Sequence, residues 1–366
     1  MGEKAMGRAR LRDLGITLGR LPTGALNAIT DVGGVEVGHS TLIRDKPSVV
    51  RTGVTMIWPA RDIFTNYCFA GFNSFNGNGE MTGTIWLAEQ GLLSAPIGIT
   101  CTHCVGVVRD AICSYAAKKG IVQAFHLPVV AETHDGYLSD AETFPVTEAM
   151  AHEALEKAKS GPVAEGNVGG GTGMICHEFK GGIGTASRIA SEAGEDFTVG
   201  VLVQANYGAR DLLRVDGVPV GREINHDVVP GHREPFKVAQ LTTDGSIIVI
   251  LATDAPLLPI QCQRLARRAA TGLAWAGGIG ANGSGDIFLA FSTGNRIDRD
   301  APHADVRMIG AERMTLLFRA AAEATEEAII NALTAAETMT GFQGRTLYEL
   351  PHDKLKQVMA KYRPAS

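Results

Sequence analysis

The chain has 366 residues, of which 45% are hydrophobic and 20% charged, and its formal net charge at pH 7 is −5. This is the composition of a globular protein with a large core; it excludes a disordered chain and gives little support to nucleic-acid binding. No apolar run approaches the roughly 18 residues of a membrane span, and the N-terminus lacks an apolar signal core. We therefore expect a cytoplasmic protein with neither a membrane nor a nucleic acid as partner.

The predicted strands are rich in Val, Ile and Thr and bounded by Gly, Pro or Asp, whereas the predicted helices show apolar residues at helical spacing. In chain order they are strands 54–58 and 96–100, helices 107–119 and 146–159, strands 198–204 and 246–253, helix 261–274, strand 286–291 and helix 311–339. There is no strict βαβ repeat, so a layered α/β or α+β sandwich fits better than a barrel. No linker or internal repeat divides the chain, and we expect one domain over residues 1–366.

Two motifs resemble metal- or cofactor-binding patterns, but the sequence around each of them does not support such a site. Cys101-Thr-His-Cys104 is half of a zinc or redox pattern, but no second pair with ligand spacing follows, so we expect buried free thiols and no metal. Gly278-Ile-Gly280-Ala-Asn-Gly283 matches the dinucleotide fingerprint, yet a helical pattern precedes it and a strand follows, the reverse of what that site needs. We expect no cofactor.

The Gly245–Ser246 peptide bond joins a polar turn to the strongly apolar strand 246–253. If this bond breaks, Ser246 carries a free amine beside its own hydroxyl, which places a nucleophile and a general base in one residue. The alternative is an ordinary turn-to-strand junction, since Asp-Gly is a common turn dipeptide.

Four further glycine-containing blocks place polar side chains where chemistry is possible. Each taken singly indicates a turn or a strand end, because glycine permits positive φ and Asn or Asp caps such turns. The blocks are residues 75–80, 131–137, 203–208 and 282–286.

Together with the Gly245–Ser246 junction, these blocks resemble the DmpA-type aminopeptidases, also called L-aminopeptidase/D-esterase or β-peptidyl aminopeptidases. The resemblance covers nearly the whole chain in eight collinear blocks: residues 8–19, 26–39, 76–83, 132–137, 166–188, 203–208, 244–258 and 278–286. It implies self-cleavage before Ser246 into an α-chain of residues 1–245 and a β-chain of residues 246–366.

The resemblance also implies roles for individual side chains. Ser246 is the nucleophile, and Ser284 and Asp286 are neighbours of its amine, although some family members carry Glu at the position of Asp286. Asn206 donates its amide to the developing oxyanion.

Substrate binding is less sharply defined by the same resemblance. Glu132 pairs with the free ammonium of the substrate, and Glu80 is a second candidate. His134 either helps the oxyanion site, lines the pocket or is an ordinary histidine of a surface loop. Tyr137 could replace it, but we expect Tyr137 to have a structural role.

The expected fold is the family's four-layer αββα sandwich, which resembles N-terminal-nucleophile hydrolases with a different strand connectivity. The expected activity is that of an aminopeptidase or amidase acting on short peptides, amides or esters with a free amine, and the expected assembly is a tetramer of αβ units. An acyltransferase like the ornithine acetyltransferases, which use threonine as the nucleophile, and a non-catalytic binding protein with this fold are the alternatives.

Overall fold

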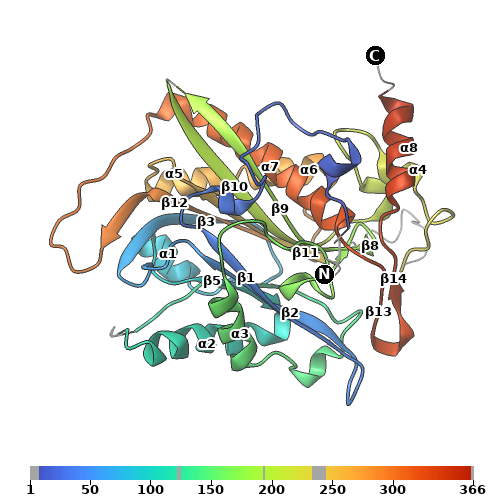
Figure 1. Ribbon diagram of the computed structural model, residues 1–366, viewed down its shortest axis with the longest axis horizontal. Coiled ribbons are helices and arrows are strands. Elements are labelled where there is room, and N and C mark those ends of the chain that lie inside the picture. Colours follow the sequence, from blue (N-terminus) through green and yellow to red (C-terminus); the bar gives the residue numbers. More distant parts are fainter. Residues whose placement is uncertain (1–7, 122–124, 193, 233–244, 364–366) are drawn as a thin grey trace, which may run out of the picture.

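The computed structural model describes residues 8–121, 125–192, 194–232 and 245–363. Four layers are stacked in Figure 1, and two of them are β-sheets that face each other in the centre. The αββα sandwich expected from the sequence is therefore confirmed.

The six-stranded sheet has the order β4-β3-β12-β11-β10-β9. Its strands are β3 (Asn66–Gly77), β4 (Leu92–Leu93), β9 (Gly182–Glu192), β10 (Glu195–Asn206), β11 (Gly245–Thr253) and β12 (Ser284–Asp298). Strand β11 is parallel to β12 and antiparallel to β10. The four-stranded sheet has the order β1-β2-β5-β6, formed by β1 (Glu36–Arg44), β2 (Val50–Trp58), β5 (Ile97–Cys101) and β6 (Val130–Thr133).

Helices form the two outer layers. Figure 1 shows α5 (Pro259–Ala266), α6 (Ala269–Trp275) and α7 (Met314–Thr334) over the six-stranded sheet, and α2 (Val105–Lys118) and α3 (Glu148–Lys157) over the other sheet. The remaining helices are α1 (Thr84–Gln90), α4 (Val220–Glu223) and α8 (His352–Tyr362). Short 3-10 turns span Leu11–Leu14, Ile29–Asp31, Thr102–Cys104, Ala141–Thr143, Gly169–Gly171, Arg210–Leu212, Ala311–Arg313 and Phe342–Gly344.

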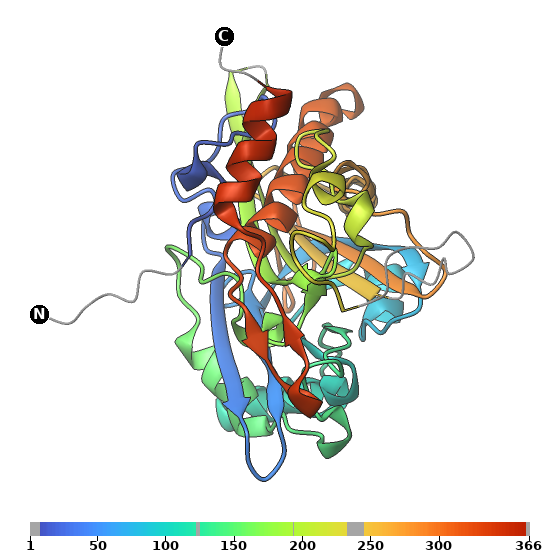
Figure 2. The same cartoon turned by 90° about the vertical axis from the view of Figure 1, so that its right-hand side faces the viewer.

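Two small hairpins complete the fold. The first joins β7 (Ile175–Cys176) to β8 (Phe179–Lys180), and the second joins β13 (Met339–Thr340) to β14 (Thr346–Leu347). Figure 2 shows the C-terminal segment, from β13 to α8, running along one side of the layers.

Strand β11 shows why the sequence folds into stacked layers. Ile247, Val249 and Leu251 belong to the core between the six-stranded sheet and its helices. Ile248 and Ile250 belong to the second core, which lies between the two sheets and extends to α2 and α3. A strand that is buried on both faces reads as a nearly continuous apolar run, and this is the pattern of residues 246–253.

All five predicted strands are present, but two predicted helices differ from the structure. The segment 261–274 is two helices, because a tight turn in which Arg268 N–H donates to Leu265 O separates α5 from α6. The helix predicted to reach residue 339 ends at Thr334, since Met339 pairs with β14 instead. The other strands were not predicted. Polar residues and glycines interrupt the strand pattern of β1, β3 and β9, and the remaining ones are only two to four residues long.

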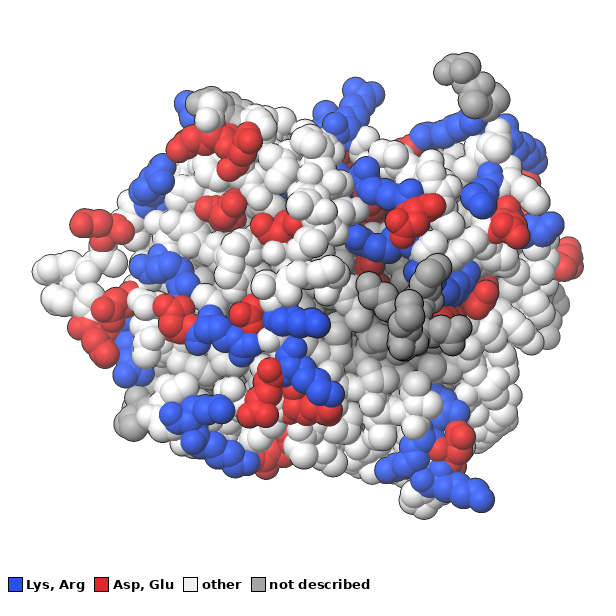
Figure 3. All heavy atoms as spheres, viewed as in Figure 1, with Lys and Arg blue, Asp and Glu red and all other residues white. Residues whose placement is uncertain are grey.

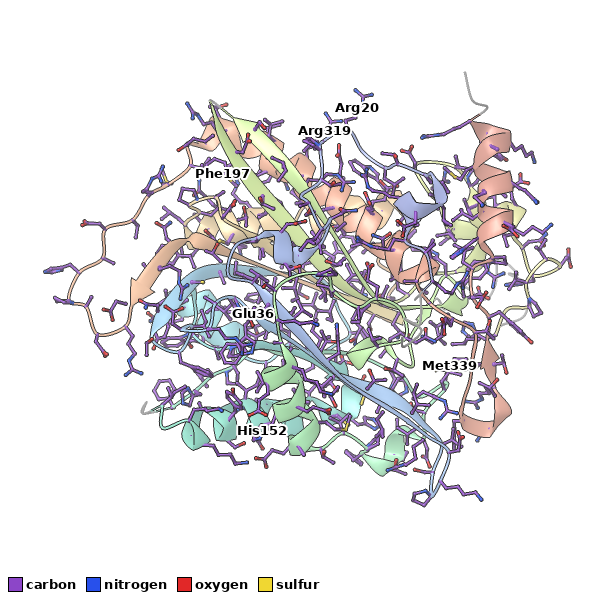
Figure 4. All side chains as sticks on the ribbon, in the orientation of Figure 1. Arg20, Glu36, His152, Phe197, Arg319 and Met339 are labelled. Atoms are coloured by element: carbon purple, nitrogen blue, oxygen red, sulfur yellow. The ribbon has the colours of Figure 1, made fainter. Side chains whose placement is uncertain are left out.

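A buried ion cluster links β9 to α7. The Arg188 guanidinium is fully buried and binds Glu323 at 3.3 Å and Glu327 at 2.6 Å, and Arg12 binds Glu327 at 2.7 Å. Although burial raises the pKa of Glu327, the hydrogen bond from Arg12 and the charge of Arg188 bring it below its usual value. At the outer end of this cluster Arg319 binds Glu323 at 2.7 Å, and Figure 4 shows Arg319 at the surface. We call Arg12, Arg188, Glu323 and Glu327 the ion cluster.

Neither the surface charge in Figure 3 nor the described helices indicate a nucleic acid or a membrane as partner. On the face shown in Figure 3, basic and acidic side chains are interspersed. Among the described residues, no helix is both long and apolar enough to span a membrane.

Candidate active site

Ser246 lies near the start of β11, between the neighbouring strands β10 and β12. In the antiparallel register it is opposite Asn206, the last residue of β10, and in the parallel register it is opposite Gly285 of β12. The end of β10 and the beginnings of β11 and β12 thus meet at one edge of the sheet. This topology brings together Asn206, Ser246, Ser284 and Asp286 from three separate parts of the sequence.

Gly245 occupies a position with no room for a side chain. A Cβ atom built there would lie 2.6 Å from the carbonyl oxygen of Asn206 and 2.7 Å from the Cα of Tyr207. Glycine is therefore needed before Ser246 because the backbone of β10 approaches closely. The predicted polar turn before Gly245 falls in residues 233–244, outside the described residues.

The Ser284 and Asp286 side chains form a buried pair. Ser284 Oγ donates a hydrogen bond of 2.6 Å to Asp286 Oδ1, and both residues are buried. Burial raises the pKa of Asp286 to about 6, against the lowering effect of the Ser284 hydrogen bond and of the Ile247 backbone N–H. Ser246 Oγ itself accepts a hydrogen bond from Gly285 N–H at 3.2 Å. Ser284 and Asp286 thus lie together on the strand next to that of Ser246.

The Asn206 amide is held from both ends. Its Oδ1 accepts the Ile175 N–H at 2.8 Å, and its Nδ2 donates to the His134 carbonyl at 3.1 Å. Because an amide nitrogen has two protons, one remains for a further acceptor. The side chain therefore presents a fixed N–H donor beside Ser246.

A cavity of about 260 Å³ opens next to Gly245. Asn206 and Gly245 form the wall nearest the junction, and the rest of the lining consists mainly of aromatic and imidazole side chains. The described residues that line it are His134, Tyr137, Ile175, Asn206, Tyr207, Gly208, His232 and Gly245. Such a cavity has room for a small acyl group.

Glu132 lies apart from this cavity, on the β12 side of Ser246. The residue is 3% exposed, and its carboxylate accepts the Glu80 N–H at 2.9 Å and the hydroxyl of Thr102. A Cβ atom at Gly79 would lie 3.2 Å from Glu132 Oε1 and 3.3 Å from the Cα of Gly285. Glycine at position 79 thus allows Glu132 to approach the strand that pairs with Ser246.

The two predicted ammonium-binding candidates differ in their surroundings. Glu80 is exposed and uses its backbone N–H to orient Glu132, whereas Glu132 is buried. A buried carboxylate with fixed donors is preorganised for a cation, so the geometry favours Glu132.

His134 contributes its backbone carbonyl to Asn206 and its ring to the cavity wall. Its pKa is lowered, first by burial and second by the neighbouring His103, so the ring is neutral near pH 7. Tyr137 also lines the cavity, and the Arg345 guanidinium lies 5.1 Å from its ring centroid.

The asparagines of the predicted block 75–80 have a structural role. Asn76 Nδ2 donates to the Ala281 carbonyl at 2.6 Å, and Asn78 Nδ2 donates to the Gly283 carbonyl at 2.8 Å. They hold the turn that leads into Ser284. The interpretation of this block as a turn or strand end therefore describes these two amides better than a chemical role.

Two residues near the site were missed at the level of sequence. Tyr207 lines the cavity, and its buried hydroxyl has no hydrogen-bond partner among the described residues. Lys180 is fully buried close to Ile175. Tyr207 lies within the block 203–208, but nothing in the sequence indicates that it lines a cavity. Lys180 stands between phenylalanine and glycine, and this context gives no sign that it is buried.

Within the described part of the chain, no group of three or more His, Cys, Asp or Glu side chains could hold a metal ion. The six cysteines are free thiols, and five of them are buried. The segment Gly278–Gly283 follows α6 and precedes β12, the order that argued against a dinucleotide site.

Comparisons with known proteins agree with this geometry. Residues 27–347 match the family described as peptidase family S58. The chain is 48% identical to the β-peptidyl aminopeptidase BapA of Sphingosinicella microcystinivorans, over 97% of this chain and 92% of that protein.

Two solved structures are also similar to it. A Burkholderia sp. β-aminopeptidase has a TM-score of 0.90 and 47% identity, covering 98% of this chain and 100% of that one. The L-aminopeptidase D-Ala-esterase/amidase of Ochrobactrum anthropi has a TM-score of 0.87 and 44% identity, covering 96% of this chain and 98% of that one. The latter is described as a prototype for the serine aminopeptidases and a new variant of the N-terminal-nucleophile hydrolase fold.

Proposed function

Because this chain belongs to peptidase family S58 and is a serine aminopeptidase of the N-terminal-nucleophile type, we propose that it cuts its own Gly245–Ser246 bond. The new N-terminal serine then releases N-terminal residues from short peptides, amides or esters. The observation that carries this proposal is the position of Ser246 at a sheet edge, with Asn206 at the end of one neighbouring strand and the Ser284–Asp286 pair at the start of the other.

Self-cleavage begins with attack of Ser246 Oγ on the carbonyl carbon of Gly245. The C–N bond breaks as the acyl group moves to oxygen, and the departing nitrogen takes up a proton to become the α-amine of Ser246. Water then hydrolyses the ester, which leaves Gly245 with a free carboxylate. The close approach of β10 supports glycine before the cut, because a Cβ atom at position 245 would lie 2.6 Å from the Asn206 carbonyl oxygen.

In the mature enzyme the α-amine of Ser246 is the general base. Its reference pKa of about 7.7–8.0 suits proton transfer near neutral pH. The amine takes the proton of Ser246 Oγ as this oxygen attacks the substrate carbonyl, and it gives the proton to the leaving group as the bond to the carbonyl carbon breaks. Water then hydrolyses the acyl-enzyme on Ser246, which releases the acid and restores the serine hydroxyl. The Ser284–Asp286 pair orients the amine and stabilises its charged form.

Asn206 and Glu132 act on opposite sides of the nucleophile. The remaining N–H of Asn206 stabilises the oxyanion, a contribution of about 3–4 kcal/mol where comparable donors have been removed. Glu132 binds the ammonium of the substrate, which restricts cleavage to free N-termini. His134 lines the acyl pocket as a neutral ring.

The names of the relatives support a proposal on substrate preference, and the family resemblance of the sequence supports one on assembly. We infer that β-aminoacyl groups are among the substrates, since similar proteins are named β-peptidyl aminopeptidase and β-aminopeptidase. No step of the scheme uses a metal or a cofactor. We also propose a homo-oligomer of αβ units in the cytoplasm.

A denaturing gel combined with N-terminal sequencing tests the proposal. The purified protein should give two bands at two-thirds and one-third of the chain, the smaller beginning at Ser246, and should hydrolyse α- or β-aminoacyl p-nitroanilides. Ser246→Ala should remain one chain without activity. An uncut wild-type chain that hydrolyses neither substrate would refute the proposal, and cleavage that persists in Ser246→Ala would place the nucleophile elsewhere.

A further inference from the structure

Lys180, at the end of β8, is a buried amine with no acidic partner among the described residues. Its side chain is fully buried, and no ion pair joins it to any carboxylate among the described residues. Burial lowers its pKa to about 7, with the Cys176 thiol as the one neighbouring group that acts in the opposite direction. A lysine in such a place is costly, since burial disfavours the charged form of an amine.

Three backbone carbonyls surround the Lys180 ammonium. Nζ donates to Gly181 O at 2.6 Å, to Met174 O at 3.0 Å and to Gly171 O at 3.4 Å. All three N–H donors of the ammonium therefore have acceptors. Two of these acceptors lie in the loop of residues 171–175, which leads into β7, so the ammonium acts mainly on this loop.

One of these carbonyls belongs to the peptide group that holds Asn206. The Met174 carbonyl accepts from Lys180, and the N–H of the same peptide group, that of Ile175, donates to Asn206 Oδ1 at 2.8 Å. A cation on the oxygen of a peptide group withdraws electron density from its nitrogen, which strengthens the N–H as a donor. Hydrogen bonds connected in this way polarise one another.

The geometry points to Lys180 as a positioning residue for the oxyanion site. Through the Met174–Ile175 peptide group, its charge orients and polarises the Asn206 amide, so that Nδ2 becomes a stronger donor to the oxyanion. This inference rests on the proposed role of Asn206. Lys180 does not touch the substrate and transfers no proton.

The loop has ties that do not depend on Lys180. Gly181 N–H donates to Met174 O at 2.8 Å, and Ile175 and Cys176 pair with Lys180 and Phe179 in the β7–β8 hairpin. A neutral residue of similar length would fill the same space without the cost of burying a charge. The ammonium is thus not needed to close the turn, but it is needed to polarise the peptide group.

Lys180→Met tests this inference, because methionine has nearly the same length and no charge. Rates are measured per cleaved chain, with the fraction of cleaved protein read from a denaturing gel. We expect kcat to fall about tenfold, part of the loss seen when an oxyanion donor is removed outright, with KM unchanged. Self-cleavage, which passes through a similar oxyanion, should also slow. Lys157→Met, at an exposed lysine of α3, is the matched control and should retain wild-type rates.

Two inhibitors separate polarisation from general distortion. An aminoacyl aldehyde forms a tetrahedral adduct with Ser246, whereas the corresponding amino alcohol cannot. In Lys180→Met the aldehyde should bind more weakly by the factor lost in kcat, while binding of the alcohol stays unchanged. Equal weakening of both inhibitors, or an unchanged kcat, would overturn the inference.

A second variant covers the case in which Lys180→Met fails to fold. Lys180→Gln keeps two N–H donors for the carbonyls without the charge, and the same loss of kcat and of aldehyde binding is expected. Asn206→Ala distinguishes the two levels of the argument. If folded Asn206→Ala cleaves itself and keeps the wild-type kcat, the proposed oxyanion donor is wrong; if it is impaired while both Lys180 variants are unaffected, only the inference on Lys180 fails.

Discussion

The protein buries charged side chains in two different ways on and beside its six-stranded sheet. In the ion cluster, the Arg188 guanidinium lies against two carboxylates, and Arg12 adds a second cation. We call the sheet edge where Asn206, Ser246 and Asp286 meet, together with the β7–β8 hairpin beside it, the catalytic edge. There, the described residues provide Lys180 only with carbonyl acceptors, and Asp286 only with the Ser284 hydroxyl and a backbone N–H. The ion cluster is compensated, whereas the catalytic edge holds single charges separately.

This difference shows how one fold serves two requirements. Compensated charges can remain ionised across a wide pH range and tie α7 to the sheet. Single buried charges shift their own pKa values and project their field onto neighbouring groups, which is the arrangement that catalysis needs. The predictions below break or sharpen this contrast, from the largest expected effect to the smallest.

Arg188→Met should have the largest effect on stability. It leaves Glu323 and Glu327 buried with less compensation, and removal of one partner from a buried ion pair typically costs about 3–5 kcal/mol. Chemical denaturation measures the loss of unfolding free energy. The fraction that stays folded should keep its kcat, so a specific loss of kcat at full stability would contradict the contrast.

Asp286→Asn should change how stability depends on pH. The folded-state pKa of about 6 lies above the ordinary value of 3.8, so the folded chain holds this proton more tightly than the unfolded chain. The stabilisation is complete below pH 4 and is lost as the pH rises through 6, a decline of about 2–3 kcal/mol.

Denaturation curves at several pH values, in the uncut Ser246→Ala background, should show a decline that is smaller by this amount when Asn replaces Asp286. Part of the decline should remain, because burial also raises the pKa values of Asp135, Glu165 and Glu326. Ser284→Ala is the informative companion. It removes a hydrogen bond that lowers the pKa of Asp286, so the decline should move to higher pH. An identical pH dependence with Asp or Asn at position 286 would show that this carboxyl is not the titrating group.

Glu132→Gln should weaken substrate binding through the ammonium. Loss of a charge-assisted contact costs about 1.5–3 kcal/mol, which is roughly a tenfold to hundredfold rise in KM. Steady-state kinetics with a free aminoacyl p-nitroanilide measure it, and an N-acetylated substrate serves as control because it lacks the charge. Glu80→Gln should change KM little, since Glu80 contributes its backbone.

Lys157→Met should have the smallest effect. Lys157 pairs with Glu153 on the exposed surface of α3, and surface pairs of this kind contribute within about 0.5 kcal/mol. Its unfolding free energy, measured under the same conditions as for Arg188→Met, sets the scale on which the buried charges are compared.

The catalytic edge shows how far the sequence could be interpreted. The apolar strand 246–253 and the resemblance of eight blocks predicted the layered fold and the residues that meet beside Ser246. The choice between Glu132 and Glu80 needed the structure, because only burial separates two carboxylates in glycine-containing loops.

Other features depend on contacts that no local pattern encodes. The division of α5 from α6 occurs within a segment with continuous helical periodicity. Lys180 looks like an ordinary surface lysine in the sequence, whereas in the structure it is buried and its Nζ donates to the carbonyls of Gly171, Met174 and Gly181. The asparagines at 76 and 78 resemble catalytic amides, yet they bind a turn about 200 residues away in the sequence.

The order of strands in the six-stranded sheet has a consequence for biosynthesis. The two strands that follow Ser246, β11 and β12, lie between β10 on one side and β3 on the other, and α7 covers β9 and β10. After the proposed cut, β11 and β12 of one polypeptide would remain hydrogen-bonded between β3 and β10 of the other. Neither fragment contains the complete six-stranded sheet, so mixing two separately expressed fragments would be a poor route to the enzyme. Translation as one precursor would fix their one-to-one stoichiometry before the link between them is removed.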